Sequence, residues 1–197
     1  PTVFNPVDFI SSRIFADFVL TLDLKGRTVM DMGCGSGIIS IFAASRGAYC
    51  LAVDINPIAV HSVKESSELN RLSGRIESIE SDLFESVPSA SGKLSNRFAG
   101  EGAYEVIFFN PPYYKGVPKN NFERAFKAGP DLEVISNFLK SAKKYLMPGG
   151  LIYFIVSSDM DLNDLKKRIN ENGFGFEIYR EIKKPLETFY IIESVTI

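Results

Sequence analysis

The sequence predicts an α/β fold in which helices cover a parallel sheet. Short apolar runs alternate with longer amphipathic segments, which is the pattern of strands joined by crossover helices. No internal repeat or heptad series is present. The 197 residues are close to the size of one ordinary domain, and 45% of them are hydrophobic, enough for a substantial core. We therefore expect one domain over residues 1–197.

Five apolar runs are expected to form the parallel strands, and four amphipathic segments the helices that follow them. The strands are expected at 28–32, 49–53, 75–81, 105–109 and 151–156. The helices are expected at 38–45, 57–69, 131–145 and 161–172. The fourth strand, Glu-Val-Ile-Phe-Phe, is so apolar that we expect it at the centre of the sheet.

Local signals support these helix boundaries. Ile38, Ile41 and Phe42 have helical spacing in the first of the four helices. Pro57 suits the first position of the next helix, where its missing N–H costs nothing. A Met-Pro-Gly-Gly sequence ends the third helix, and Gly173 ends the fourth.

Two long irregular stretches and a pair of closing strands complete the organisation. Residues 85–103 are rich in Ser, Gly and Ala, and residues 111–129 follow the central strand. Loops of such length in a compact domain are usually functional or disordered. The final apolar runs, 176–182 and 189–196, have no helix between them, which predicts an antiparallel pair.

Charge and composition argue against several classes of protein. Twenty-two Lys plus Arg and 24 Asp plus Glu give a net charge of −2, which disfavours binding mainly through a basic surface, although a local basic face fits this total. No apolar run approaches the roughly 18 residues of a membrane span, and residues 1–6 lack a signal-peptide pattern. We expect a cytoplasmic protein with no membrane partner. Cys34 and Cys50 are too few for a disulfide scaffold and lack metal-ligand spacing, so no metal is expected.

The first candidate site is Asp31-Met32-Gly33-Cys34-Gly35-Ser36-Gly37, between the first strand and its helix. Glycines there let the backbone turn sharply and approach a ligand, which favours a nucleoside site over a plain turn. A dinucleotide fingerprint would need glycine at Ile38, and this departure disfavours NAD. Cys34 needs only to be small in this position, so we expect no nucleophilic role for it.

Two carboxylates end the next two strands. Asp54 lies 23 residues after Asp31, where an acidic residue can accept hydrogen bonds from both ribose hydroxyls. Its alternative role is to cap the following helix, but Asn56 could do that. Asp82 could accept from an adenine amino group, and a turn or cap role fits it almost equally well.

The most specific motif is Asn110-Pro111-Pro112-Tyr113, at the end of the fourth strand. Two prolines cannot extend a sheet, so the chain leaves it rigidly with Asn110 at the rim. The asparagine and proline carbonyls can accept both hydrogens of a planar amino group, holding its nitrogen for in-line attack and favouring the developing positive charge. Tyr113 can stack on that group. The alternative is a proline turn with a surface tyrosine pair.

Together these motifs resemble the class I S-adenosylmethionine-dependent methyltransferases, in the branch that carries the Asn-Pro-Pro-Tyr motif. The resemblance implies a Rossmann-like three-layer sandwich whose seven-stranded, mostly parallel sheet has an antiparallel last strand. It implies that the glycine loop holds the methionine portion and ribose, that Asp54 binds the ribose hydroxyls, and that Asp82 with Leu83 contacts adenine. The implied cofactor-binding residues are Asp31, Gly33, Cys34, Gly35, Gly37, Asp54, Ile55, Asp82, Leu83 and Asn110, and the implied catalytic residues are Asn110, Pro111, Pro112 and Tyr113.

The acceptor stays open between two kinds of planar nitrogen. Enzymes with this motif methylate glutamine amides in translation release factors or exocyclic amino groups of adenine or guanine in RNA or DNA. Residues 3–8, Val-Phe-Asn-Pro-Val-Asp, look like the proline-containing segment of the glutamine branch, whereas Tyr114-Lys115-Gly116 departs from the aliphatic residue and proline usual there. The near-neutral charge favours a protein glutamine, with a nucleobase as the alternative.

We therefore expect N-methyl transfer from S-adenosylmethionine, with S-adenosylhomocysteine as product. An NAD-dependent oxidoreductase and a non-catalytic cofactor-binding subunit are the alternatives from other classes. Because the core takes up almost the whole chain, acceptor recognition is expected from the loops 85–103 and 114–129, from a segment before Pro1, or from a small partner subunit. Tyr114, Phe122 and Phe126 could line the acceptor pocket or simply pack the second loop.

Overall fold

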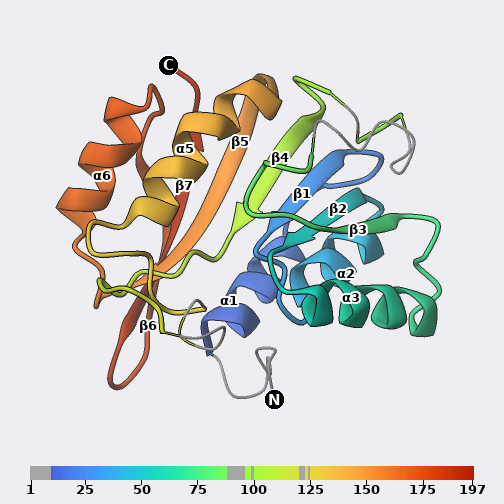
Figure 1. The fold of residues 1–197 in the computed structure, drawn as a ribbon, viewed down its shortest axis with the longest axis horizontal. Helices are drawn as coiled ribbons and strands as arrows, with labels where there is room; N and C mark the ends of the chain where they lie inside the picture. Colours follow the sequence, from blue (N-terminus) through green and yellow to red (C-terminus); the bar gives the residue numbers. More distant parts are fainter. Residues whose placement is uncertain (1–9, 88–95, 99, 120–122, 124) are drawn as a thin grey trace.

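A computed structural model describes residues 10–87, 96–98, 100–119, 123 and 125–197. Its sheet has seven strands in the order β3-β2-β1-β4-β5-β7-β6 (Figure 1). The first five strands in sequence are mutually parallel, and β7 is antiparallel to both β5 and β6. The expected α/β sheet with an antiparallel last strand and a central fourth strand is confirmed. No helix among the described residues is long and apolar enough to cross a membrane.

The strands follow the expected apolar runs closely. They are β1 (Thr28–Met32), β2 (Tyr49–Asp54), β3 (Ile76–Glu80), β4 (Tyr104–Phe109), β5 (Leu146–Ser157), β6 (Glu177–Lys183) and β7 (Thr188–Val195). One boundary differs by more than one residue, because β5 begins at Leu146, directly after a helix, where Leu146 pairs with Tyr104. The register then shifts before Val106 pairs with Leu151. The Met-Pro-Gly-Gly sequence, expected to separate the helix from the strand, therefore lies inside β5 as an irregularity in its pairing.

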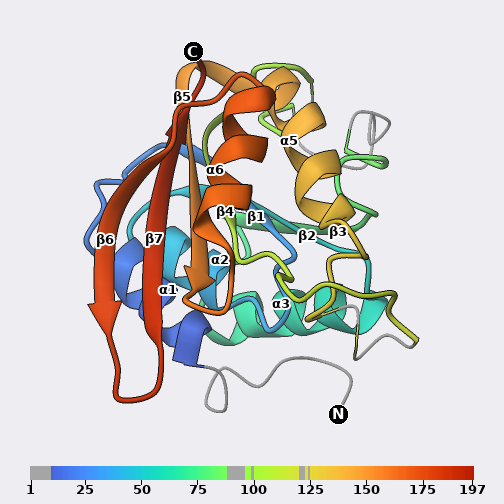
Figure 2. The same cartoon turned by 90° about the vertical axis from the view of Figure 1, so that its left-hand side faces the viewer.

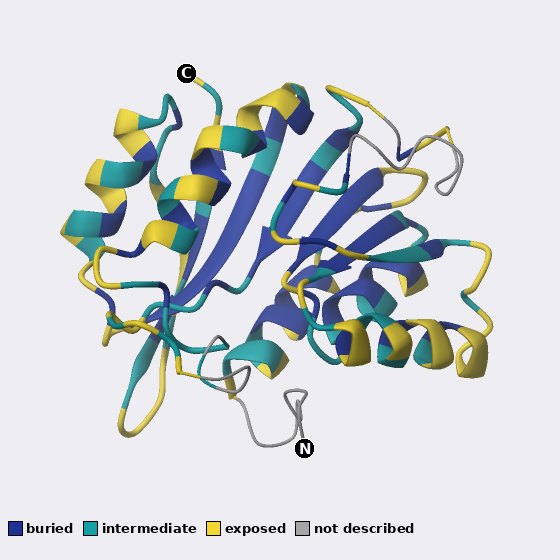
Figure 3. Cartoon of the chain, in the orientation of Figure 1, coloured by how far each residue is buried: buried dark blue, intermediate teal, exposed yellow. Residues whose placement is uncertain are grey.

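Helices cover both faces of the sheet (Figures 1 and 2). On one face lie α1 (Ile10–Val19), α2 (Ile38–Ser45) and α3 (Pro57–Leu69); on the other lie α5 (Glu133–Tyr145) and α6 (Leu162–Glu171). Each face has its own apolar core, because alternate strand residues point to opposite sides. The central strands β1, β2 and β4 are almost wholly buried, whereas the edge strand β6 is largely exposed and the helices expose their outer faces (Figure 3). The three-layer sandwich is therefore confirmed.

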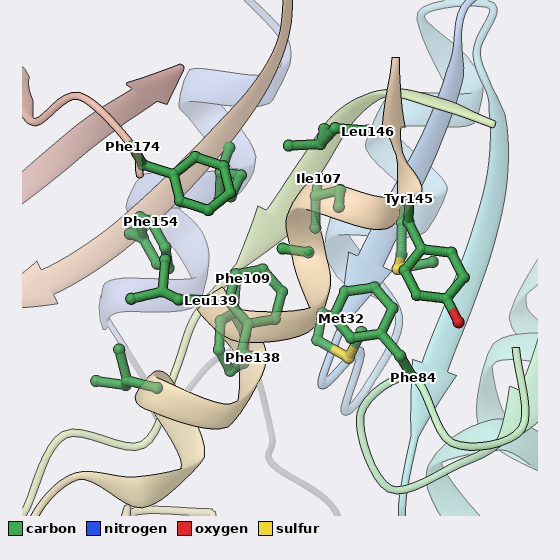
Figure 4. Close-up of a cluster of buried hydrophobic side chains, with 14 of the residues drawn as sticks. Met32, Phe84, Ile107, Phe109, Phe138, Leu139, Tyr145, Leu146, Phe154 and Phe174 are labelled. Carbon is green, nitrogen blue, oxygen red and sulfur yellow. The ribbon is translucent and has the colours of Figure 1, made fainter. Parts of the chain in front are cut away.

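The core under α5 contains a group of packed aromatic side chains (Figure 4). The ring of Phe109, the last residue of β4, lies 4.4 Å from that of Phe138 on α5. Phe84 stacks on Tyr145 with ring centroids 4.6 Å apart. These contacts fix the end of β4 and the segment after β3, the two places from which Asn110 and Asp82 project.

The helix beginnings show their sequence signals in three dimensions. Asn56 accepts a hydrogen bond from the backbone N–H of Ile58 at 3.0 Å, and Pro57 follows it as the first helical residue. Asp161 caps α6 in the same manner. The helix expected from residue 131 begins only at Glu133, because Leu132 adopts a left-handed conformation with φ of 57°.

The described part of the loop 85–103 packs against the beginnings of two strands. Residues 88–95 and 99 of this loop lie outside the described residues, but Phe98 is buried and its carbonyl accepts from the Tyr104 hydroxyl at 3.0 Å. The Arg97 guanidinium lies 3.8 Å from the ring centre of Tyr49. Tyr49 and Tyr104 both begin strands, so this part of the loop is held at the amino-terminal edge of the sheet.

Candidate active site

A pocket of about 470 Å³ opens at the carboxyl ends of β1, β2 and β4. The chain builds β1, β2 and β3 in one direction and then places β4 on the other side of β1. Open parallel sheets bind ligands in the crevice at such a reversal of strand order. The fold itself therefore locates a ligand site between the loops that follow these strands.

The pocket brings together nearly every residue that the sequence singled out. From the glycine loop and the two following strands it is lined by Asp31, Gly33, Cys34, Gly35, Asp54, Ile55, Asp82 and Leu83. From the end of β4 it is lined by Asn110, Pro111, Pro112 and Tyr113. Both predicted groups share one cavity, as transfer between a cofactor and an acceptor requires.

Gly37 is the predicted residue that does not line the pocket. Its backbone has φ of 80°, and a Cβ atom there would lie 2.7 Å from Cγ2 of Val63 on α3. This glycine therefore lets α2 begin close against α3. Its contribution is the shape of the loop and the packing beneath it.

The Asp31 carboxylate is buried and bound to the first turns of α2. One oxygen, Oδ2, accepts from the Ser40 hydroxyl at 2.6 Å and from the Ser40 backbone N–H at 3.0 Å. Burial raises the pKa of Asp31 from 3.8 to about 7; the two Ser40 hydrogen bonds oppose this shift, and the nearby Asp54 carboxylate adds to it. Asp31 thus connects the end of β1 to α2 across the glycine loop.

The raised pKa predicts a pH-dependent stability that Asp31→Asn should remove. The folded protein holds the Asp31 proton up to about pH 7, whereas the unfolded chain releases it near pH 4, so this residue lowers stability as pH rises through that window. Relative to the wild type, the variant should gain on the order of 1–3 kcal/mol between pH 5 and pH 8. Urea unfolding at the two pH values measures this, and parallel stability profiles would contradict it.

The Asp54 carboxylate joins the end of β2 to the glycine loop. Its Oδ2 accepts from the Gly35 backbone N–H at 2.8 Å, and its Oδ1 accepts from the Asn56 backbone N–H at 2.9 Å. Burial raises its pKa, and these backbone hydrogen bonds oppose the shift. A carboxylate has about four lone-pair positions, so each oxygen can still accept a further hydroxyl from the pocket.

The segment after β3 supplies an exposed carboxylate and a strained leucine. Asp82 is exposed at the pocket rim, and Leu83 beside it lines the pocket with φ of 48°. A left-handed non-glycine residue is sparsely populated and persists where its surroundings determine it. Phe84, packed under α5, supplies that constraint.

Asn110 has a neighbour that sequence reasoning missed. Its amide Nδ2 lies 3.5 Å from the Ser12 hydroxyl on α1, at the long limit of a hydrogen bond. Both Ser11 and Ser12 line the pocket. Donation to Ser12 leaves the Asn110 carbonyl oxygen to face elsewhere in the pocket. The residues are 98 positions apart, so no local pattern could have linked them.

The two tyrosines after the prolines form an aromatic pair at the pocket. Their ring centres lie 5.0 Å apart with an interplanar angle of 47°. The Tyr114 hydroxyl donates to Oδ2 of Asp159 at 2.9 Å, and Tyr113 is hydrogen-bonded to Ser157. Burial raises the pKa of Tyr113, with added repulsion from the carboxylates of Glu187 and Asp159. Both phenols therefore stay neutral at physiological pH.

Residues 114–116 pair with residues 126–129 beside these two tyrosines. The Tyr114 N–H donates to the Phe126 carbonyl at 2.9 Å, and the Ala128 N–H donates to the Tyr114 carbonyl at 2.9 Å. Gly116 and Gly129 form a further bridge. Tyr114 and Phe126 both line the pocket, whereas Phe122 lies outside the described residues.

Cys34 is enclosed by the glycine loop and is unsuited to act as a nucleophile. Its side chain is 6% exposed, and burial raises its thiol pKa well above the usual range, with the Asp31 and Asp54 carboxylates adding to the shift.

Because both cysteines are buried, we expect iodoacetamide at pH 8 to leave them unmodified in the native protein and methyl transfer unaffected. Mass spectrometry measures the modification. Rapid inactivation that follows Cys34 alkylation would show that the thiol is accessible.

The fold and the pocket define a class I S-adenosylmethionine-dependent methyltransferase: a glycine loop after β1, a carboxylate after β2 and an antiparallel last strand. The family model of the methyltransferase small domain matches residues 5–180. The chain belongs to this family. The oxidoreductase and non-catalytic alternatives are thereby set aside.

Relatives with different acceptors resemble the chain. A protein of Methanocaldococcus jannaschii, named as a candidate protein N5-glutamine methyltransferase, is 32% identical over 98% of this chain and 92% of its own length. Ribosomal RNA small subunit methyltransferase C of Chromohalobacter salexigens is 28% identical over 82% of this chain and 42% of its own length. The fold also matches the Mtq2–Trm112 complex of E. cuniculi, described as responsible for methylation of the eRF1 translation termination factor. That match has a TM-score of 0.73, 21% identity and full coverage of both chains.

Proposed function

We propose that this enzyme transfers a methyl group from S-adenosylmethionine to a glutamine side chain of a protein. The observation that carries the proposal is that Asn110, Pro111 and Tyr113 line the same cavity as the glycine loop and Asp54. The alternative acceptor is an exocyclic amino group of adenine or guanine in RNA or DNA.

The pocket has the features that the cofactor needs. Its volume of about 470 Å³ lies in the range of small-molecule sites, and both Asp54 oxygens retain lone pairs for ribose hydroxyls. We assign the adenine side to Ile55, Asp82 and Leu83, and the methionine side to the glycine loop with Asp31. When bound, S-adenosylmethionine supplies an electrophilic methyl group.

The chain's own residues then orient the acceptor. The Asn110 side-chain carbonyl and the Pro111 backbone carbonyl accept the two hydrogens of the planar amide, which aims its nitrogen at the methyl group. Both carbonyl dipoles favour the positive charge that develops on that nitrogen. Pro112 makes the turn rigid, and Tyr113 stacks on the planar group. The Cys34 environment agrees with direct transfer without a covalent enzyme intermediate.

Charge and relatedness support a protein acceptor. The enzyme carries a net charge of −2, and the carboxylates of Asp159 and Glu187 add to the raised pKa of Tyr113. Negative charge beside the tyrosine pair disfavours the approach of phosphates. The M. jannaschii relative is named for glutamine methylation, and the E. cuniculi complex for methylation of a termination factor. A translation release factor is therefore the protein substrate that we propose.

We also propose how the acceptor is recognised. Residues 1–197 would form one methyltransferase domain, and the described parts of the loop 114–129, 114–119 and 125–129, would face the acceptor, whereas 120–122 and 124 lie outside the described residues. Of the other loop, 85–103, we assign only the part next to β3 to acceptor recognition. Residues 96–98 are held at the amino-terminal edge of the sheet, opposite the pocket. A small partner subunit, as in the E. cuniculi complex, could complete the recognition surface.

Labelled methyl transfer to a cell extract tests the acceptor class. The enzyme is incubated with extract and S-adenosylmethionine labelled on its methyl group, and the product is split for protease and nuclease digestion. Protease-sensitive label with methylglutamine in the hydrolysate is expected. Label that only nuclease removes would assign the nucleobase alternative instead.

A further inference from the structure

The β6–β7 hairpin reaches the edge of the sheet that holds the pocket. Because β7 runs antiparallel to β5, its first residues lie beside the last residues of β5: Phe189 pairs with Ser157, and Ser158 N–H donates to the Thr188 carbonyl at 2.7 Å. The turn at 183–187 therefore projects beyond the carboxyl ends of the parallel strands (Figures 1 and 2).

The tip of this hairpin presents a leucine that has no packing role in the fold. Leu186 is fully exposed, the most exposed of the large hydrophobic side chains among the described residues. The turn is closed by a hydrogen bond from the Lys184 N–H to the Glu187 carbonyl at 2.9 Å, and Pro185 restricts its backbone. The leucine is thus held on a hydrogen-bonded turn at the edge of the sheet where the pocket opens.

The hairpin is continuous with the acceptor side of the pocket. Thr188, at the base of the hairpin, binds Ser158, which precedes Asp159, and the neighbouring Glu187 carboxylate adds to the raised pKa of Tyr113 and Tyr114. Asp159 binds the Tyr114 hydroxyl, and Tyr114 is itself 43% exposed. A surface of leucine, tyrosine and two carboxylates therefore leads from the hairpin tip to Tyr114, which lines the pocket.

We propose that this surface, formed by Leu186, Tyr114, Asp159 and Glu187, binds a protein acceptor. It contacts the folded part of the acceptor next to the methylated residue. The acceptor contributes an apolar segment that is neutral or basic. This inference rests on the proposed protein acceptor. An exposed apolar side chain gains most from burial against another protein, and carboxylates repel phosphates. The cation at the tip is Lys184, since Lys183 is paired with Glu181 at 3.4 Å.

The chain offers a matched control for Leu186. Leu69, at the end of α3, is 84% exposed. The helix α3 leaves β2 at the pocket edge and returns to the start of the parallel strand β3, so its end lies at the opposite edge. Leu186→Ser and Leu69→Ser therefore remove equivalent exposed side chains from opposite ends of the molecule, and neither should change the unfolding temperature.

The test compares Leu186→Ser, Leu69→Ser and Lys184→Gln with the wild type. Labelled methyl transfer is measured to a purified release factor at varied concentration, and to extract digested with protease or nuclease. For Leu186→Ser we expect kcat/KM toward the release factor to fall about five- to thirtyfold, the range for loss of an interface anchor, mainly through KM. The other two variants should stay within about twofold of the wild type, and all should bind S-adenosylmethionine equally.

The outcomes separate this inference from the proposed function. Protein labelling that falls equally, or not at all, in Leu186→Ser and Leu69→Ser overturns the docking surface and leaves glutamine methylation standing. Label found only in nucleic acid overturns the proposed function. A decrease of that label in Lys184→Gln but not in Leu186→Ser would show that the tip binds phosphates, which also overturns docking of a protein.

Discussion

Replacing Asn110 with alanine is expected to slow methyl transfer about a hundredfold or more while cofactor affinity stays nearly unchanged. The asparagine carbonyl holds the acceptor nitrogen and favours the charge that develops there, so its loss affects the transition state more than the bound cofactor. Single-turnover transfer measures the rate, and calorimetry measures the affinity. A collapse of cofactor binding would instead make Asn110 a cofactor ligand or a determinant of the fold.

Ser12→Ala provides the companion to this variant. Ser12 lies 3.5 Å from the Asn110 amide nitrogen and touches that residue from α1. Its removal should loosen the orientation of the amide without deleting the carbonyl oxygen, so we expect a severalfold decrease in rate, far smaller than for Asn110→Ala. Equal losses in the two variants would show that the position of α1, and not the amide, limits transfer.

Replacing Asp54 with alanine is expected to weaken S-adenosylmethionine binding by roughly 1.5–3 kcal/mol, the range for hydrogen bonds to a charged group. The variant loses the ribose acceptor and also frees the Gly35 N–H that Asp54 holds at 2.8 Å. Calorimetry with the cofactor measures the change. An unchanged affinity would contradict the ribose assignment.

Asp54→Asn separates the two contributions of this carboxylate. The Gly35 and Asn56 N–H groups bind different oxygens of Asp54. The amide keeps only one acceptor oxygen, so it can serve one of these N–H groups but not both. We expect its cofactor affinity to lie between those of the wild type and Asp54→Ala. Unfolding without cofactor shows how much of the loss comes from the loop itself.

The sequence predicts the elements best where local chemistry determines them. The sequence predicts the helix from Pro57 because Asn56 can cap it and proline suits its first position, and both features are observed. The strand from Thr28 ends at a glycine loop, and the structure ends it there. These signals act within a few residues, so one sequence is sufficient to locate them.

The sequence predicts poorly where distant residues decide the conformation. Leu132 takes a left-handed conformation that its side chain disfavours, and the start of α5 shifts to Glu133 in consequence. The pairing of residues 114–116 with 127–129 depends on bridges such as Tyr114 with Lys127 that have no periodic pattern. Both are imposed by packing, which local preference does not reveal.

The candidate site shows the same division. The glycine loop, Asp54 and Asn110 carry recognisable motifs, and the topology brings them to one cavity. Ser12 and Asp159 carry none, because each acquires its neighbour from a strand or loop far along the chain. A sequence therefore indicates the groups that take part in chemistry more readily than the groups that orient them.

The place of β7 in the sheet affects how the protein forms during synthesis. Thr188–Val195 is the last strand in sequence, yet it pairs with β5 on one side and β6 on the other. Until it leaves the ribosome, the outer edge of β5 is unpaired and β6 has no neighbour, and exposed strand edges promote wrong association. We therefore expect nascent chains that stop before Thr188 to depend on chaperones, although the glycine loop and Asn110 are already made.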